Sequence, residues 1–189
     1  RSGTFVIEAA LRARNIAPGI RRRFAAQNWT CFHNTIFDDV RRDAVNQVHR
    51  DAPFMAYASD LDPQAVQLTI ENAAKAGVAS RIRVHQANVA DFQPNIKMEQ
   101  KGIVLTNPPY GERMLEVSDA EALYRTMGEV FKPAENLSYY IISPHEEFED
   151  LFGRKAVRRR KLYNGMIKCQ LYMYFNKGAK PAKKPELKK

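Results

Sequence analysis

Helix-type and strand-type patterns alternate along most of this chain, and no other feature limits its fold as strongly. The predicted helices cover 3–14, 36–50, the segment between Asp62 and Gly77, 119–131 and a short stretch from 143 to about 153; the predicted strands cover 54–58, 81–86, 102–106 and 137–142. Alternating units of this kind predict an α/β fold, with a mostly parallel sheet and helices on both faces.

Local signals refine two of the helices. Asp62 is expected to cap a helix that has Pro63 in its first turn, and Ser118 with Glu121 forms a capping box ahead of 119–131. In the first two helices the apolar spacing predicts one buried face each. These faces would carry Phe5, Val6, Ala9, Ala10 and Ala13 in the first helix, and Ile36, Val40, Ala44 and Val48 in the second.

The last structured unit has a different pattern. Segments 157–163 and 166–175 flank Asn164-Gly165, a pair typical of a type I′ turn with positive φ at both positions. This pattern predicts an antiparallel hairpin at one edge of the sheet.

Positive charge is concentrated after residue 153. Segment 154–189 holds 13 of the 30 Lys and Arg residues and one acid, whereas 1–153 holds 17 basic and 20 acidic residues. In this basic segment, the first strand of the hairpin carries Arg158, Arg160 and Lys161. A strand with charged side chains on both faces belongs at an exposed sheet edge, where they bind phosphates or only protect the edge. If these side chains bind phosphates, Arg158, Arg160 and Lys161 are predicted to form an RNA-binding site.

Several classes of protein are excluded by composition. No apolar run reaches the ~18 residues of a membrane span, and no signal peptide is visible. Cys31 and Cys169 lie far apart and have no metal-ligand spacing, which argues against a zinc site or a disulfide scaffold. The sequence predicts a cytoplasmic protein without a metal.

The strongest chemical signal follows the strand 102–106, because ligands of such sheets bind beyond the carboxyl ends of the strands. Asn107, Pro108, Pro109 and Tyr110 come directly after it. Two prolines make a rigid corner whose carbonyl groups accept hydrogen bonds, Asn107 adds a carboxamide oxygen, and Tyr110 adds a flat ring. This set of groups suits methylation of an exocyclic amine on a nucleobase, although a plain Pro-Pro turn is the simpler alternative.

Three further candidates have weaker signals. Asp60 follows the strand 54–58, where a carboxylate can accept from both ribose hydroxyls of a nucleoside cofactor. Asp91 and Phe92 follow the strand 81–86, where they could bind and stack on adenine, or serve as a loop acid and a core aromatic. Segment 2–4 opens the first helix, whose backbone N–H groups can bind a carboxylate.

A dinucleotide-dependent dehydrogenase is excluded by the glycine pattern. Such enzymes carry G-x-G-x-x-G with an acid about 20 residues further on. Of this glycine pattern only Gly3 is present here, and Asp60 lies 57 residues beyond it.

Six sequence strings resemble the THUMP-associated RNA methyltransferase family, which includes bacterial large-subunit rRNA guanine-N2 methyltransferases and relatives labelled N6-adenine-specific DNA methylases. They are 2–10 (Ser-Gly-Thr-x-x-x-Glu-Ala-Ala), 17–19 (Ala-Pro-Gly), 59–62 (Ser-Asp-Leu-Asp), 107–113 (Asn-Pro-Pro-Tyr-Gly-Glu-Arg), 153–156 (Gly-Arg-Lys-Ala) and 160–165 (Arg-Lys-Leu-Tyr-Asn-Gly). The resemblance covers nearly all of 2–175.

The resemblance implies a class I methyltransferase sheet and S-adenosylmethionine as methyl donor. By this resemblance, Ser2, Gly3 and Thr4 belong to the loop around the methionine moiety. Asp60 binds the ribose, Asp91 and Phe92 bind the adenine, and Asn107, which also borders the cofactor, holds the target base together with Pro108, Pro109 and Tyr110.

The chain departs from the family pattern at its start. The family has a strand and Asp-Pro-x-Cys-Gly before Ser-Gly-Thr, and an RNA-binding THUMP region further upstream, whereas this sequence begins at Arg1. The expectation is therefore an N-terminally truncated catalytic domain over 1–176, without its first strand, and a basic, disordered tail over 177–189.

The leading hypothesis is methyl transfer to the N2 amine of a guanine in ribosomal RNA, with 23S rRNA as the partner. One alternative is adenine-N6 methylation of DNA, since both targets are ring-attached amines. Another is a nonenzymatic RNA-binding module with a degenerate cofactor site, which Arg1 in place of the family's glycine would favour.

Overall fold

The computed structural model describes residues 2–33, 35–94, 96–97, 99–110 and 117–175. The chain divides into two compact units, 1–88 and 89–189, and each is described by itself. The predicted tail 177–189 lies outside the described residues, as do Gly111, Glu112 and Arg113 of the longest family string. No helix among the described residues is long and apolar enough to cross a membrane.

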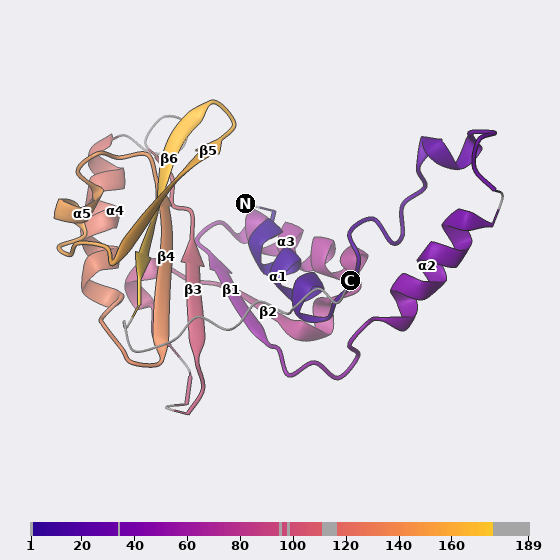
Figure 1. Cartoon of the computed structure of the whole chain (residues 1–189). Helices are drawn as coiled ribbons and strands as arrows, with labels where there is room; N and C mark the ends of the chain where they lie inside the picture. Colours follow the sequence, from indigo (N-terminus) through magenta and orange to yellow (C-terminus); the bar gives the residue numbers. More distant parts are fainter. Residues whose placement is uncertain (1, 34, 95, 98, 111–116, 176–189) are drawn as a thin grey trace. The chain divides into compact units, whose positions relative to one another are not determined.

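Unit 1 is a two-stranded parallel sheet with helices (Figure 1). β1 (Ala56–Asp60) pairs with β2 (Ile82–Gln86), from Ala56 opposite Ile82 to Asp60 opposite Gln86. Its helical segments are α1 (Thr4–Ala13), the 3-10 turn η1 (Ala25–Asn28), α2 (Ile36–Asn46), α3 (Pro63–Ala76) and the 3-10 turn η2 (Ala79–Arg81).

The core of unit 1 lies between α1, α3 and the sheet. Its buried residues are Ile7, Ala10, Ala73, Val78 and Ile82. The predicted ends of α3 are confirmed. The Asp62 carboxylate accepts from the backbone N–H of Gln64 at 2.8 Å, and Gly77 ends the helix with a φ of 74°. Strong local caps place α3 immediately after β1, which positions Asp60 beside the start of a helix.

Unit 2 is a mixed sheet in the order β3-β4-β6-β5. β3 (Gly102–Thr106) and β4 (Leu137–Ser143) are parallel, and β6 (Ile167–Tyr174) is antiparallel to β4 and to β5 (Arg158–Asn164). The other segments are η3 (Val89–Asp91), α4 (Val117–Val130) and α5 (Phe148–Leu151). The α/β class, the terminal hairpin and the edge position of its first strand are therefore confirmed.

Aromatic rings fill the core of unit 2. Tyr124 and Phe148 are fully buried, and Phe148 packs against Tyr172 with ring centroids 4.5 Å apart. Phe131 stacks on Tyr139 at 5.2 Å. Since these rings come from α4, β4, α5 and β6, they fix both helices to one face of the sheet.

Gly128 lets α4 approach the end of α5 closely. A Cβ atom at this position would lie 2.2 Å from the carbonyl oxygen of Phe152, a backbone atom that cannot rotate away. Alanine favours a helix by about 0.5–1 kcal/mol over glycine, but overpacking costs about 1–3 kcal/mol, so the clash should dominate. Gly128→Ala is expected to lower the free energy of unfolding, as measured by urea denaturation.

Glu129→Ala is the matched control, because Glu129 is the exposed neighbour on the same helix. It should change stability by less than about 0.5 kcal/mol. If Gly128→Ala proved as stable as the wild type, the close approach of the two helices would be wrong.

Several expected boundaries and faces are wrong. β1 runs to Asp60 rather than ending at Ala58, so Asp60 is the last residue of the strand instead of following it. α2 ends at Asn46 and has no buried residue, and Val40 is 63% exposed. In α1 the buried residues are Ile7 and Ala10, whereas Phe5 is exposed. An apolar stripe becomes a buried face only when another element packs on it, which the stripe alone does not show.

Two predictions from local signals are also wrong. α4 already includes Val117, so Ser118 lies inside the helix and does not cap it. The hairpin turn is Gly165-Met166, because Asn164 pairs with Ile167. Only Gly165 has a positive φ, 61°, which fits a type II′ turn with glycine first instead of the expected type I′.

In the described part of the chain, β1 pairs only with β2 and β3 only with β4. The expectation of a further strand before Arg1 stays a prediction, as does the division into a domain over 1–176 and a tail.

Candidate active site

The Asn-Pro-Pro-Tyr corner stands at the carboxyl end of β3. Thr106, the last residue of the strand, lies opposite Ile141 of β4, so the corner begins beside the end of a second parallel strand. Pro108 is buried, and Asn107, Pro109 and Tyr110 are half-buried. The corner is therefore part of the fold of unit 2 and not an exposed loop, which favours the functional interpretation over a plain turn.

The hydroxyl of Tyr110 holds the corner together. It donates to the carboxamide oxygen Oδ1 of Asn107 and accepts from Nδ2 of Asn164 at 3.3 Å. The thiol of Cys169 lies 3.8 Å from the same oxygen. A phenol oxygen has one proton to donate and two lone pairs, and these contacts use all three. They orient the Asn107 carboxamide with its oxygen toward Tyr110, and that oxygen keeps a second lone pair for a ligand.

A second hydroxyl fixes the backbone of the corner. Tyr124 of α4 donates to the carbonyl of Pro109 at 3.2 Å and accepts from Ser143, the last residue of β4, at 3.3 Å. Both Tyr124 and Ser143 are fully buried. Burial raises the pKa of Tyr124 despite the hydrogen bond from Ser143, so the phenol keeps the proton that it donates to Pro109.

His145 extends this network. Its Nε2 atom lies 3.6 Å from a carboxylate oxygen of Glu121, and its backbone N–H donates to Ser143 at 3.1 Å. Its own carbonyl accepts from the Tyr172 hydroxyl at 3.2 Å. Buried donors and acceptors that satisfy one another resist rearrangement, so the corner has a rigid support.

Asp91 and Phe92 lie in the same unit as the corner. Asp91 ends η3 and is exposed, whereas Phe92 is half-buried and packs edge-on against Phe131 with centroids 5.0 Å apart. Phe92 thus has a core partner on one side. Its role in stacking on adenine stays a prediction, as does the role of Asp91.

The segment Ser2–Thr4 is held at the start of α1 in unit 1. Ser2 Oγ lies 3.1 Å from Thr4 Oγ1, and the carbonyl of Ser2 accepts from Asn72 of α3 at 3.1 Å. Gly3 has a φ of 74°, and a Cβ there would lie 2.4 Å from Thr69. Only glycine fits this approach to α3, and the backbone N–H groups of the first turn suit an anionic group.

Asp60 lies half-buried at the carboxyl end of β1. Its carboxylate accepts from the backbone N–H of Asp62 at 3.1 Å. Partial burial acts to raise its pKa, but hydrogen bonds to the carboxylate, including those from the N–H groups of Leu61 and Asp62, hold the pKa below its usual value. The group is therefore ionised at neutral pH, as a ligand for ribose hydroxyls should be.

The hairpin residues divide between two faces. Arg159 pairs with Glu149 at 3.6 Å and lies opposite Tyr172, so it belongs to the face that α5 covers. By strand alternation Arg158 and Arg160 belong to the other face. Both are exposed, as is Lys161, whose ammonium lies 5.3 Å from the ring centroid of Tyr163.

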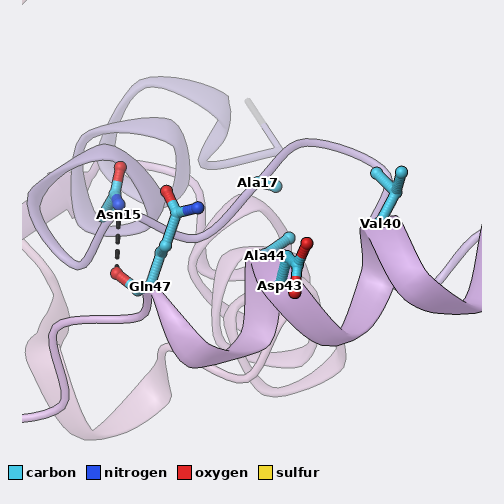
Figure 2. A pocket seen from close by; sticks show the side chains of 6 residues that line it. All are labelled: Asn15, Ala17, Val40, Asp43, Ala44 and Gln47. Atoms are coloured by element: carbon cyan, nitrogen blue, oxygen red, sulfur yellow. Dashed lines mark hydrogen bonds between the residues drawn. The ribbon is translucent and has the colours of Figure 1, made fainter. Parts of the chain in front are cut away.

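One pocket of unit 1 contains none of the predicted site residues. It lies between the end of α1 and α2, where the side chain of Asn15 donates to the Gln47 carbonyl at 3.0 Å (Figure 2). Its lining is formed by Asn15, Ala17, Val40, Asp43, Ala44 and Gln47. Nothing in this lining resembles a site for methyl transfer.

Sequence reasoning missed the residues that support the corner. Ser143 follows the strand rule that identified Asn107, since it ends a parallel strand, and could have been found in that way. Tyr124 and Cys169 could not be found in this way, because each lies on the buried face of its own helix or strand. They contact the corner only in the tertiary fold.

The comparisons with known proteins agree on one family. The model of the RMKL-like methyltransferase domain matches residues 2–173. The chain is 40% identical over 185 residues to a Bacillus subtilis protein named "Putative RNA methyltransferase YpsC", covering 98% of this chain and 47% of that protein. It is 32% identical to the ribosomal RNA large subunit methyltransferase K/L of Marinobacter nauticus, covering 92% and 25%. The chain thus spans about half the length of the first relative and a quarter of the second.

Solved structures agree. The structure of SMU.472 complexed with SAH superposes with a TM-score of 0.87 at 37% identity, covering 95% of this chain and 47% of that one. A Listeria monocytogenes protein described as a predicted N6-adenine-specific DNA methylase gives 0.82 at 37% identity, covering 92% and 44%. The expected class I methyltransferase fold is confirmed. So is S-adenosylmethionine as the cofactor of the family, since SAH is what remains of it after methyl transfer.

With the matched domain extending over nearly all of the chain, the resemblance noted from six short strings is confirmed, and the chain belongs to the family of the RMKL-like methyltransferase domain.

Proposed function

We propose that the chain transfers a methyl group from S-adenosylmethionine to the exocyclic N2 amine of a guanine in 23S ribosomal RNA. The observation that carries this proposal is the Asn107–Tyr110 corner. Its carboxamide oxygen is oriented by the Tyr110 hydroxyl, and its backbone is fixed by Tyr124. Such a corner presents hydrogen-bond acceptors and an aromatic ring at the end of a strand. A nucleobase needs both, the acceptors for its amino group and the aromatic ring for stacking.

The residues present fit the cofactor. The start of α1 offers backbone N–H groups for its carboxylate, and Asp60 offers carboxylate oxygens for its ribose. Asp91 and Phe92 are the proposed adenine contacts. When bound, the cofactor supplies a methyl group on a sulfonium, which an amine nitrogen can attack directly.

The chain's own part in the reaction is positioning. Asn107 Oδ1 and a backbone carbonyl of the corner accept the two amine protons, which directs the nitrogen lone pair out of the base plane. Stacking on Tyr110 holds the base in place. The amine nitrogen would take the methyl group as its bond to sulfur breaks, and the surplus amine proton would then pass to solvent water. Orientation of this kind can contribute several kcal/mol without any covalent intermediate.

The names of the relatives support RNA as the substrate, because they describe ribosomal RNA and RNA methyltransferases. The name of the Listeria relative describes an N6-adenine-specific DNA methylase, so DNA adenine is the second candidate. The choice of guanine N2 rests on the family resemblance. The same resemblance supports a THUMP region in the same polypeptide, a cytoplasmic location and a catalytic domain over 1–176.

A labelling experiment tests the function. The complete protein is incubated with S-adenosylmethionine and ribosomal RNA from a strain that lacks the gene, and the modified nucleoside is identified by mass spectrometry. N2-methylguanosine in 23S rRNA is the expected product. N6-methyladenine in a DNA control would support the second candidate, and no product from either would contradict both.

Arg158 and Arg160 are proposed to bind RNA phosphates. Each phosphate that the protein no longer binds should reduce the slope of log affinity against log salt by about 0.7–0.9. Replacing both arginines by Gln should therefore weaken RNA binding at low salt and flatten the slope by about 1.4–1.8, as measured by filter binding. S-adenosylmethionine affinity should not change, since neither arginine is a proposed cofactor ligand.

Arg159→Gln is the matched control on the same strand, because Arg159 is paired with Glu149 on the other face. It should change the slope less than the double variant does. Equal slopes for all variants and the wild type would make Arg158 and Arg160 guards of the sheet edge.

A further inference from the structure

Residues 21–51 of unit 1, here termed the arm, fold without burying a side chain. None of the described residues in this segment, 21–33 and 35–51, is buried, although it contains η1 and α2. Figure 1 shows α2 in violet on the loop that leaves α1 and returns to β1. An ordered segment with so much exposed apolar surface indicates a binding surface.

Aromatic rings form one part of this surface. Trp29 is 59% exposed and Phe24 44%. Trp29 stacks on Phe32 with centroids 6.1 Å apart and planes 13° apart, and Phe37 packs edge-on against Phe32 at 5.6 Å. The indole is thus supported on one side by a second ring while most of its surface stays open. A flat, supported ring of this kind suits stacking by another planar group.

Unbalanced positive charge forms the other part. No acid occurs from residue 15 to residue 37, which include Arg21, Arg22 and Arg23. Two of the three acids of α2 are already engaged, since Asp38 pairs with Arg41 at 3.5 Å and Asp39 pairs with Arg42. In the described part of the chain, Arg22 and Arg23 form no ion pair. Both are exposed, so their charge is available to an anionic partner.

The backbone that carries these arginines is held in place. Arg41 donates from Nε to the carbonyl of Ile20 and from its terminal nitrogen to the carbonyl of Arg22, both at 3.1 Å. Arg21 donates to the carbonyl of Lys75 in α3 at 2.9 Å. Because the loop is already ordered, a partner would lose less of its binding free energy in ordering it.

We propose that the arm binds single-stranded RNA, with a base stacked on Trp29 and phosphates bound by Arg22 and Arg23. The inference rests on the proposed function, which makes RNA the substrate. Exposed aromatic rings and arginines without an ion pair, carried on one segment of chain, are the combination by which proteins bind unpaired nucleotides. The arm would be an RNA site in addition to the corner that receives the target base. It would hold other, unpaired nucleotides of the substrate RNA and so contribute to the choice of RNA.

The test measures binding of the complete protein to a labelled oligouridylate of about 12 nucleotides, within the usual site size for single strands, by fluorescence anisotropy. Trp29→Ala is expected to weaken binding about 5- to 100-fold, as removal of a base–aromatic stack does. Trp29→Phe keeps a ring and should restore most of the affinity. The oligonucleotide should also quench wild-type tryptophan emission, and the part due to Trp29 should be missing in Trp29→Phe.

Charge variants complete the experiment. Replacing Arg22 and Arg23 together by Gln should reduce the slope of log affinity against log salt by about 1.4, at about 0.7 for each phosphate of a single strand. Arg42→Gln is the matched control, because Arg42 lies on the same arm but is paired with Asp39. It should leave the slope nearly unchanged.

Two outcomes would overturn the proposal. One is unchanged affinity and slope in Trp29→Ala and in the double arginine variant. The other is a complex of two protein chains, seen by sedimentation, that Trp29→Ala disrupts while RNA affinity stays the same, since the arm would then be a protein interface. Methyl transfer by the wild type is measured in parallel. Its absence would contradict the proposed function, whether or not the arm binds the oligonucleotide.

Discussion

Asn107→Ala is expected to reduce methyl transfer by about 100-fold or more while S-adenosylmethionine affinity changes little. The carboxamide oxygen of Asn107 is the side-chain acceptor of the corner, and the Tyr110 hydroxyl fixes its direction. A hydrogen bond to the amine gains most strength as positive charge develops on the nitrogen. Removing such a transition-state interaction costs about 10²–10³ in rate in enzymes where single donors have been deleted.

Single-turnover rates on ribosomal RNA measure this effect, and calorimetry measures cofactor binding. Asn107→Asp is a useful companion, because it keeps an oxygen at Oδ1 and should retain more activity than the alanine variant. An alanine variant within a few-fold of the wild-type rate would show that the corner does not hold the amine.

Tyr110→Phe separates orientation from stacking. It keeps the ring but removes the hydroxyl that bridges Asn107 to Asn164 of the hairpin. We expect a smaller loss of rate than for Asn107→Ala. Asn164→Ala should then have little further effect in the Tyr110→Phe background, because the two residues act through one hydroxyl. Additive losses would mean that Asn164 acts by another route.

The sequence predicted best those elements whose signals are local. β3 has its expected bounds because Gly102–Thr106 is an apolar run, and α3 has its expected ends because Asp62, Pro63 and Gly77 each favour one helix position. The expected bounds of β1 are wrong because the apolar run that predicted this strand stops at Ser59. Its pairing with β2 continues to Asp60 opposite Gln86, and that pairing depends on residues far along the chain.

The candidate site shows the same limit. Asn107 was found because it follows a recognisable strand, whereas Tyr124 and Cys169 reach the corner from a helix and a strand that follow it in sequence. Their polar atoms lie on faces that any apolar pattern would assign to the core. The prediction for α2 failed in the opposite sense, since its regular apolar spacing predicted a buried face but none of its residues is buried.

Asp60→Ala is expected to weaken S-adenosylmethionine binding by about 10- to 100-fold. The Asp60 carboxylate ends β1 and accepts from the N–H of Asp62. An ionised carboxylate can accept several hydrogen bonds at once, so it can bind ribose hydroxyls as well. Charge-assisted hydrogen bonds contribute about 1.5–3 kcal/mol, which corresponds to this change in affinity. Calorimetry on the complete protein measures it.

Asp62→Ala is the matched control, two residues away on the same loop. Asp62 caps α3 through Gln64, so its removal should lower the free energy of unfolding by about 1 kcal/mol and leave cofactor affinity nearly unchanged. The pH dependence gives a second check. Aspartate side chains ionise well below neutral pH, so the contribution of Asp60 to binding should be constant through neutral pH and be lost only under acidic conditions, as the carboxylate gains a proton. Unchanged affinity in Asp60→Ala would place the ribose ligand elsewhere and leave Asp60 as a residue that only shapes the turn into α3.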